Sequence, residues 1–221
     1  MQSNCGSEHT PRYKHVAVLG IDGMGSFNRL TDTPGMDELF ANGAVTYNAL
    51  SMNPTISAEN WGAMLIGANP IAHGLTNSIV GRFEYKNKEL PSVFTRIREA
   101  YPDAYLASCC NWNPINHGII EHDIGVDLRT AENDEALTPV ICEVVAKKPL
   151  FLFVQLDDVD GAGHGSSYGS AGHLKKITET DVLIGRICDA YRQAGILDDT
   201  LILVIADHGG IRNGHGGYMD Y

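Results

Sequence analysis

The sequence predicts an α/β fold, with a mostly parallel central sheet and helices on both of its faces. Three apolar runs are too short for helices and predict buried strands: residues 15–21 (HVAVLGI), 150–156 (LFLFVQL) and 200–206 (TLILVIA). Helical patterns lie between these runs, and strands that alternate with helices are typical of a parallel sheet covered on both faces. Because such sheets bind ligands beyond the carboxyl ends of their strands, a functional site is expected there.

Four stretches of the chain carry the helical pattern: residues 57–66, 92–100, about 132–146 and about 171–194. In the fourth, apolar residues spaced by threes, fours and sevens fall on one face, and Gly195 marks its end. The polar segment 77–89 is expected to form an excursion or a short hairpin over the site. Residues 111–127, which are rich in Asn, Gly and His, are expected to form a loop.

Length and composition indicate one globular domain. The chain has 221 residues, of which 43% are hydrophobic and 19% charged, and this is enough to bury one substantial core. We expect residues 1–14 to form a tail and residues 15–221 to form a single domain. The formal net charge of −11 argues against non-specific binding to nucleic acid or to an anionic membrane. The sequence carries no signal for the oligomeric state.

The cysteine pattern predicts a protein that resides in a reducing compartment, and the hydropathy predicts that no segment spans a membrane. The five cysteines, at positions 5, 109, 110, 142 and 188, form no CxxC pair and no disulfide framework. The N-terminal residues contain no apolar signal-peptide core, and no stretch approaches the roughly 20 apolar residues needed to cross a membrane. We therefore expect a soluble, cytoplasmic protein.

Carboxylates and imidazoles follow the three predicted strands. Asp22 ends the first strand, Asp160 and His164 follow the second in a glycine-rich loop, and Asp207 and His208 follow the third. A single Asp or His of this kind is more often a turn or cap residue. Together they predict a metal site at one edge of the sheet, because a borderline metal ion accepts carboxylate oxygen and imidazole nitrogen together.

Two further residues are candidates for the same site. His215 follows His208 by seven positions, within a Gly-His-Gly-Gly segment. Ser57 begins a helical stretch, where a serine is commonly an N-cap. A helix N-terminus also binds phosphate through its free N–H groups and its dipole, and a metal-bound serine there would be ionised and nucleophilic near neutral pH. The two roles of Ser57 are compatible.

In the order of its motifs, the chain resembles the alkaline phosphatase superfamily, and within it the type I phosphodiesterase and nucleotide pyrophosphatase branch. Beginning with the first predicted strand, the motifs that carry the resemblance are Asp22-Gly23, a Pro-Thr segment with a hydroxyl nucleophile, His73-Gly74, Asp160-x-x-Gly163-His164 and Asp207-His208-Gly209. The resemblance implies an alkaline-phosphatase-like three-layer sandwich and a hydrolase of phosphodiesters or nucleotide pyrophosphates. It also implies that the catalytic domain lacks the usual C-terminal segment, because the sequence stops at Tyr221.

The resemblance assigns a role to each candidate residue. Spacing back from His73-Gly74 puts the nucleophile at Ser57 rather than Thr55, and puts Asn60 where this branch holds a phosphate oxygen with a side-chain amide. It implies two divalent metal ions, with Zn²⁺ expected and Mn²⁺ as the alternative. The implied ligands of one ion are Asp22, Asp207, His208 and the bridging Ser57, and those of the other are Asp160, His164 and His215.

The implied reaction is an in-line attack of Ser57 on the phosphorus of a small-molecule phosphate ester. No Lys or Arg occurs between Asn53 and Val80, which favours a diester over a dianionic monoester. Two alternatives stay open: a phosphomonoesterase or phosphomutase of the same superfamily, and an inactive metal-binding protein. A sulfatase is excluded, because sulfatases carry Pro and Arg two and four positions after the modified residue, where this chain has Glu59 and Trp61.

Overall fold

The centre of the computed structural model, which describes residues 12–82 and 89–217, is a five-stranded sheet in which every pairing is parallel. Its order is β3-β2-β4-β1-β5. The strands are β1 (His15–Ile21), β2 (Leu106–Cys110), β3 (Asp127–Thr130), β4 (Phe151–Leu156) and β5 (Thr200–Ile205). The three strands expected from the sequence are β1, β4 and β5, and they are neighbours in the sheet. Their carboxyl ends therefore meet at one place.

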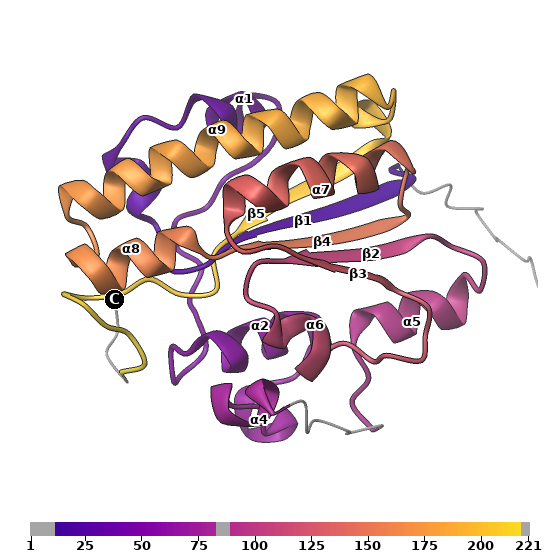
Figure 1. Cartoon of the computed structure of the whole chain (residues 1–221), viewed down its shortest axis with the longest axis horizontal. Helices are drawn as coiled ribbons and strands as arrows, with labels where there is room; N and C mark the ends of the chain where they lie inside the picture. The colour runs from indigo at the N-terminus through magenta and orange to yellow at the C-terminus, as the bar shows by residue number, and fades with distance from the viewer. Residues whose placement is uncertain (1–11, 83–88, 218–221) are drawn as a thin grey trace, which may run out of the picture.

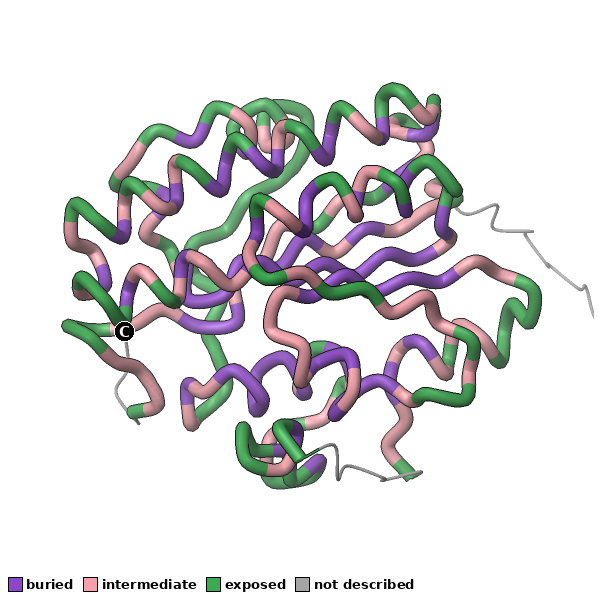
Figure 2. Tube along the Cα trace, in the orientation of Figure 1, coloured by how far each residue is buried: buried purple, intermediate pink, exposed green. Residues whose placement is uncertain are grey.

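Helices cover both faces of the sheet, so the molecule has three layers (Figure 1). One face carries α1 (Pro34–Ala41), α7 (Asp134–Ala146) and α9 (Ala171–Gln193), and the other carries α2 (Ser57–Ile66), α5 (Val93–Ala100) and α6 (Pro114–Gly118). Each face has its own buried apolar cluster, one around Leu19 and Ile184 and one around Trp61 and Phe153. Buried residues follow the strands and the inner sides of these helices (Figure 2). The predicted three-layer α/β sandwich is confirmed.

Several short elements were not expected from the sequence. They are η1 (Phe27–Leu30), α3 (Pro70–His73), α4 (Asn77–Gly81) and η2 (Leu197–Asp199), together with α1, α6, β2 and β3. The loop expected at 111–127 contains α6, which begins with a proline at its first position. The excursion expected at 77–89 begins as the helix α4, and residues 83–88 lie outside the described part of the chain. Within the described residues, no helix has both the length and the apolar character needed to cross a membrane.

The prediction of a glycine-rich loop after β4 is wrong, because Asp158–Ser166 forms the helix α8. Glycine weakens a helix, but here the first N–H groups are held from outside. The carboxylate of Asp134 accepts hydrogen bonds from the N–H groups of Asp157 and Asp158, at 2.8 and 3.0 Å. A Cβ atom at Gly163 would lie 2.4 Å from the ring of Tyr168, so glycine allows this ring to pack on the helix.

Candidate metal centre

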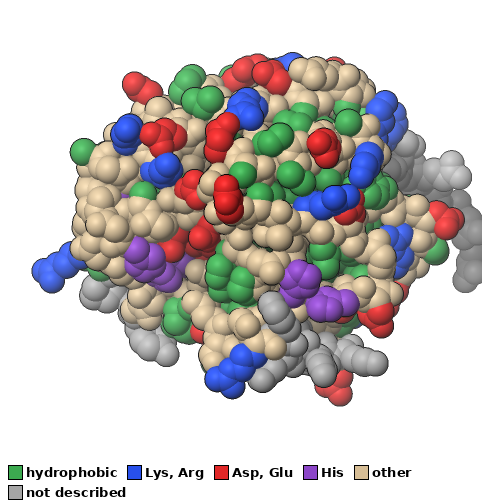
Figure 3. Space-filling model, viewed as in Figure 1, with side chains coloured by type: hydrophobic (Ala, Val, Ile, Leu, Met, Phe, Trp, Pro, Cys, Tyr) green, Lys and Arg blue, Asp and Glu red, His purple; other side chains and the backbone are tan. Residues whose placement is uncertain are grey.

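The predicted ligands converge at the carboxyl ends of β4, β1 and β5. Asp22 directly follows β1, Asp207 lies two residues beyond β5, and Asp160 lies on α8, which follows β4. Because α8 is helical, Asp160 and His164 are one turn apart on the same helix face. Histidine side chains reach the surface at two places on the face shown in Figure 3, and one of these lies beside acidic side chains.

The first cluster surrounds Nε2 of His208. This atom lies 3.2 Å from Ser57 Oγ, 3.2 Å from Asp207 Oδ2 and 3.5 Å from Asp22 Oδ1. The Nδ1 atom of the same ring is 3.0 Å from the carbonyl oxygen of Gly209, which can only accept, so Nδ1 carries the proton. In the neutral ring, Nε2 therefore presents its lone pair to the cluster.

Each carboxylate of this cluster has one oxygen held by donors and one oxygen left over. Asp22 Oδ2 accepts from Trp61 Nε1 and Gln155 Nε2, at 2.8 and 3.0 Å. Asp207 Oδ1 accepts from the N–H groups of Gly23 and His208, at 3.1 and 2.9 Å. The remaining atoms, Asp22 Oδ1 and Asp207 Oδ2, are buried and have no hydrogen-bond partner among the residues that the structure describes. Two such oxygens beside an imidazole lone pair fit a divalent cation, which would compensate their burial.

The pKa shifts in the first cluster also fit a bound cation. Burial and the nearby carboxylates Asp207, Asp157 and Asp160 raise the pKa of Asp22 well above its usual range. Burial, together with the charge of Asp160, raises the pKa of Asp207 to about 7. Burial lowers the pKa of His208, which keeps the ring neutral. A bound cation would favour the ionised carboxylates and the neutral imidazole that a metal site needs.

The second cluster consists of Asp160, His164 and His215. The Nδ1 atom of His164 is 2.9 Å from the carbonyl oxygen of Asn213, and that of His215 is 2.7 Å from the carbonyl oxygen of Thr55. Both Nε2 atoms therefore face inward as acceptors, and they lie only 3.1 Å apart. Asp160 Oδ2 lies 3.2 Å from His164 Nε2. Two lone pairs and a carboxylate at these distances also fit a cation.

Asp160 links the two clusters. Two sets have ligand atoms within 4.8 Å of one another: Asp160, His164 and His215, and Asp22, Asp160 and His208. The rings of His208 and His215 stack with their centroids 3.8 Å apart. The candidate centre is therefore continuous, and all seven residues predicted as ligands lie in it.

Asn60, the eighth predicted site residue, makes its hydrogen bonds elsewhere. Its Oδ1 accepts from the N–H group of Met52 at 2.7 Å, and its Nδ2 donates to the carbonyl oxygens of Met52, Pro54 and Ile56. These bonds hold the segment that leads into α2. The hydroxyl of Thr55, the competing nucleophile, accepts from the N–H group of Gly216 at 2.8 Å.

Three residues that contact the centre were not recognised in the sequence. Trp61 and Gln155 bind Asp22, and Tyr168 donates a hydrogen bond to Asp160 Oδ1. Gln155 had a signal in the sequence, since it is the one polar residue in the apolar run FLFVQL, and the structure shows that it is fully buried. Trp61 and Tyr168 had none, because aromatic residues in such positions are usually core residues.

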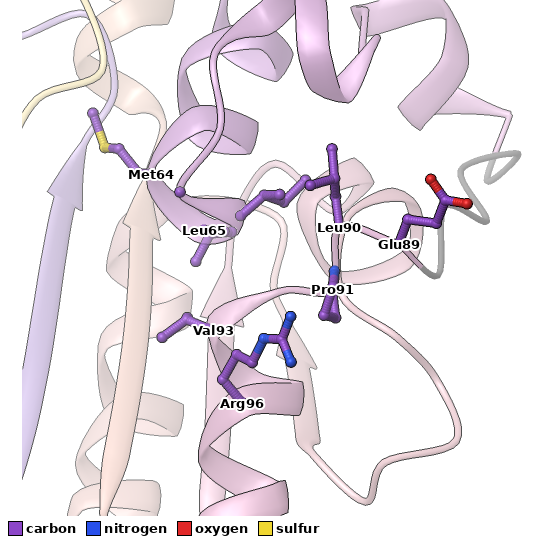
Figure 4. Close-up of a pocket in the computed structure, with 9 residues that line it drawn as sticks. Met64, Leu65, Glu89, Leu90, Pro91, Val93 and Arg96 are labelled. Carbon is purple, nitrogen blue, oxygen red and sulfur yellow. The ribbon is translucent and has the colours of Figure 1, made fainter.

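A separate pocket of about 260 Å³ contains none of the predicted site residues. Apolar side chains from the end of α2 and from residues 90–93, where α5 begins, form much of its lining, and the charged residues Glu89 and Arg96 also line it (Figure 4). Ser57 lies at the opposite end of α2, a helix of 10 residues. The pocket and the metal centre are therefore distinct.

Comparison with solved structures shows a shared fold at low sequence identity. Murine ectonucleotide pyrophosphatase/phosphodiesterase 5, in an inactive form in complex with AMP, superposes with a TM-score of 0.70 and 15% identity, over 89% of this chain and 57% of that chain. A 2-O GAG sulfatase superposes with a TM-score of 0.69 and 12% identity, over 94% of this chain and 62% of that chain. The present chain thus spans less than two thirds of each structure.

Sequence comparison identifies the family. Mouse ectonucleotide pyrophosphatase/phosphodiesterase family member 3 is 33% identical over 64 residues, which are 29% of this chain and 7% of that protein. The sequence profile of the type I phosphodiesterase / nucleotide pyrophosphatase family matches residues 16–94 and 83–219, and so covers nearly the whole chain. The chain belongs to the type I phosphodiesterase/nucleotide pyrophosphatase family.

Proposed function

We propose that this chain is a metal-dependent hydrolase of phosphodiesters or nucleotide pyrophosphates, with Ser57 as its nucleophile. The observation that supports this most is the pair of unpartnered buried oxygens, Asp22 Oδ1 and Asp207 Oδ2, next to the serine hydroxyl and His208 Nε2. Buried carboxylate oxygens without a partner are costly, and a bound cation would compensate this cost. A hydroxyl beside a cation loses its proton more easily and can act as a nucleophile. Family membership supplies the class of reaction.

The donor sets suit two divalent ions. Mixed carboxylate and imidazole ligands fit Zn²⁺, and Mn²⁺ is the alternative. When bound, the ions would supply positive charge that lowers the pKa of the serine hydroxyl and offsets the charge of the phosphate oxygens. We infer that one set of ligands is Asp22, Ser57, Asp207 and His208, and that the other is Asp160, His164 and His215.

We propose that the reaction has two steps, an attack by Ser57 on phosphorus and a later attack by water. Ser57 is the first residue of α2, so a phosphate group at its hydroxyl meets the positive end of the helix dipole. Its hydroxyl loses its proton as the oxygen attacks phosphorus in line, and the ester oxygen leaves with the bonding electron pair and is protonated. Water later attacks the same phosphorus, gives a proton to the departing serine oxygen and so releases the phosphate group. We assign Asn60 to holding residues 52–56 in front of the helix, because its amide is already engaged there.

We propose a small-molecule phosphate ester as the substrate. The murine neighbour was determined in complex with AMP, which is a nucleotide phosphate. The absence of Lys and Arg from the sequence between Asn53 and Val80 favours a singly charged diester over a doubly charged monoester. We treat residues 15–221 as the single domain that performs this reaction.

The test is a metal-supplemented assay of the whole chain with an aryl phosphodiester and an aryl phosphomonoester in parallel. We expect Zn²⁺ or Mn²⁺ to support cleavage of the diester. Ser57→Ala should remove this activity, while Ser51→Ala, at an exposed serine, should leave it unchanged. Cleavage of the monoester alone would favour the phosphomonoesterase alternative. Bound metal without cleavage of either ester would favour an inactive metal-binding protein.

A further inference from the structure

Trp61 connects the helix that carries Ser57 to the end of strand β1. It lies four residues after Ser57 on α2, and thus about one turn further along the same helix face. Its side chain is fully buried, and its Nε1 donates a hydrogen bond of 2.8 Å to Asp22 Oδ2. One side chain therefore joins the proposed nucleophile helix to a proposed metal ligand.

The surrounding residues fix the position of the indole ring. The ring packs edge-on against Phe153 of β4, with centroids 5.6 Å apart and an interplanar angle of 78°. A Cβ atom at Gly20 would lie 2.4 Å from Trp61 Cη2, so β1 leaves room for the ring only because it carries a glycine there. A ring held from two strands keeps its N–H group directed at Asp22.

The hydrogen bond decides which oxygen of Asp22 is available. Gln155 donates to the same oxygen, Oδ2, at 3.0 Å. The other oxygen, Oδ1, is buried 3.5 Å from His208 Nε2 and accepts no hydrogen bond from the described part of the chain. Donors on one carboxylate oxygen commonly set the rotation of a metal-binding carboxylate and leave the other oxygen for the ion.

We propose that Trp61 is a positioning residue, which orients Asp22 as a metal ligand and fixes that ligand relative to Ser57. The proposal rests on the proposed function, because it assigns Trp61 a role at the same metal centre. This role distinguishes Trp61 from core residues that contribute only through packing. A tryptophan that served only packing would contribute through its ring, and its N–H group would have no effect on metal binding.

The first test uses the indole N–H signals of the whole chain, labelled with ¹⁵N and stripped of metal. The chain has two tryptophans, and Trp112→Phe assigns the two signals. On titration with Zn²⁺, we expect the signal of Trp61 to shift strongly and in step with binding measured by calorimetry, with a smaller response from Trp112. Asp22→Asn should abolish the shift. An unmoved Trp61 signal while Zn²⁺ binds would overturn the proposal, and no variant of Trp61 is needed to obtain this result.

The second test separates the N–H group from the ring. Trp61→Phe keeps an aromatic ring without a donor, and we expect Zn²⁺ affinity to fall about 10- to 100-fold. Trp61→His restores a ring N–H group and should recover part of this loss. Phe94→Leu changes a buried aromatic residue of the same apolar cluster that packs on Phe151, and it should lower thermal stability but leave the affinity unchanged. Affinity that is equal in Trp61→Phe and the wild type would contradict the role of the N–H group.

Kinetics separate this proposal from the proposed function. We expect Trp61→Phe, saturated with Zn²⁺, to show a lower kcat for the aryl phosphodiester with little change in KM. A wild-type chain that binds Zn²⁺ with the Trp61 shift but cleaves neither ester would refute the function and leave the positioning role intact. A wild type that cleaves the diester, with an unchanged kcat and Zn²⁺ affinity in Trp61→Phe, would refute the positioning role alone. Failure of the wild type to bind either Zn²⁺ or Mn²⁺ would overturn both.

Discussion

The Nε2 atoms of His164 and His215 lie 3.1 Å apart, and the Nδ1 atom of each ring faces a backbone carbonyl oxygen. This pairing fixes both tautomers, so the two Nε2 lone pairs are directed at each other. A cation bound by both rings would relieve the repulsion between them. One ring comes from α8, which follows β4, and the other comes from the segment after β5. These two strands both pair with β1, which lies between them in the sheet.

Removal of His215 should empty one of the two metal positions. We expect His215→Ala to lower bound zinc from about two ions to about one per chain, because Asp160 and His164 alone make a poor site. Elemental analysis after dialysis measures this ratio. His122→Ala, at an exposed histidine outside the centre, is the matched control and should keep both ions. An unchanged zinc content in His215→Ala would refute its role as a ligand.

The metal-free protein should lose stability as the pH rises. Burial raises the pKa of Asp207 to about 7 in the folded chain, against about 3.9 for an unfolded aspartate. Between about pH 3.9 and about pH 7, Asp207 is protonated in the folded state but ionised in the unfolded state. The free energy of unfolding is therefore highest at low pH and decreases as the pH rises through about 7. Urea unfolding at pH 5 and pH 8, with chelator present, measures the loss.

Asp207→Asn is the comparison for this pH dependence, because an amide does not ionise. We expect a smaller decrease in stability between pH 5 and pH 8 for this variant than for the wild type. The same variant should bind less zinc in elemental analysis, since it removes a carboxylate ligand. Parallel pH dependence in the two proteins would count against a raised pKa at Asp207, and unchanged zinc content would count against its ligand role.

Asn60 should matter for the fold of the segment before α2. Asn60→Ala leaves the N–H group of Met52 and the carbonyl oxygen of Ile56 without their side-chain partner. We expect a loss of about 1–3 kcal/mol in the free energy of unfolding, measured with urea. Asn48→Ala, at an exposed position, should cost little. A variant as stable as the wild type but without activity would instead favour direct contact between Asn60 and phosphate.

The sequence was sufficient for the strands and helices with a strong apolar pattern. β1 matches the predicted bounds, and α2 begins at Ser57 as expected. β2 and β3 were missed because LASCC and DLRT are short and contain few large apolar residues. The helix α8 was missed because its N-terminus is stabilised by Asp134, a residue of another helix, and such contacts have no local signal.

The same distinction holds for the site. The convergence of the candidate ligands that follow strands was predictable, because parallel strands bring their carboxyl ends together. The roles of Trp61 and Tyr168 depend on which side chains they meet in space, and their positions in the sequence resemble ordinary core positions. Asn60 has the spacing of a phosphate-binding residue, but the path of residues 52–56 decides where its amide is engaged.

We propose Ser57 as the nucleophile of a metal-dependent phosphodiester hydrolase. The most direct measurement compares wild type and Ser57→Ala for zinc content and for turnover of an aryl phosphodiester, on the same preparations. We expect the variant to keep its bound zinc, because the carboxylate and histidine ligands remain, and its turnover to fall to the level without enzyme. Turnover retained by a zinc-loaded Ser57→Ala variant would show that Ser57 is not the nucleophile.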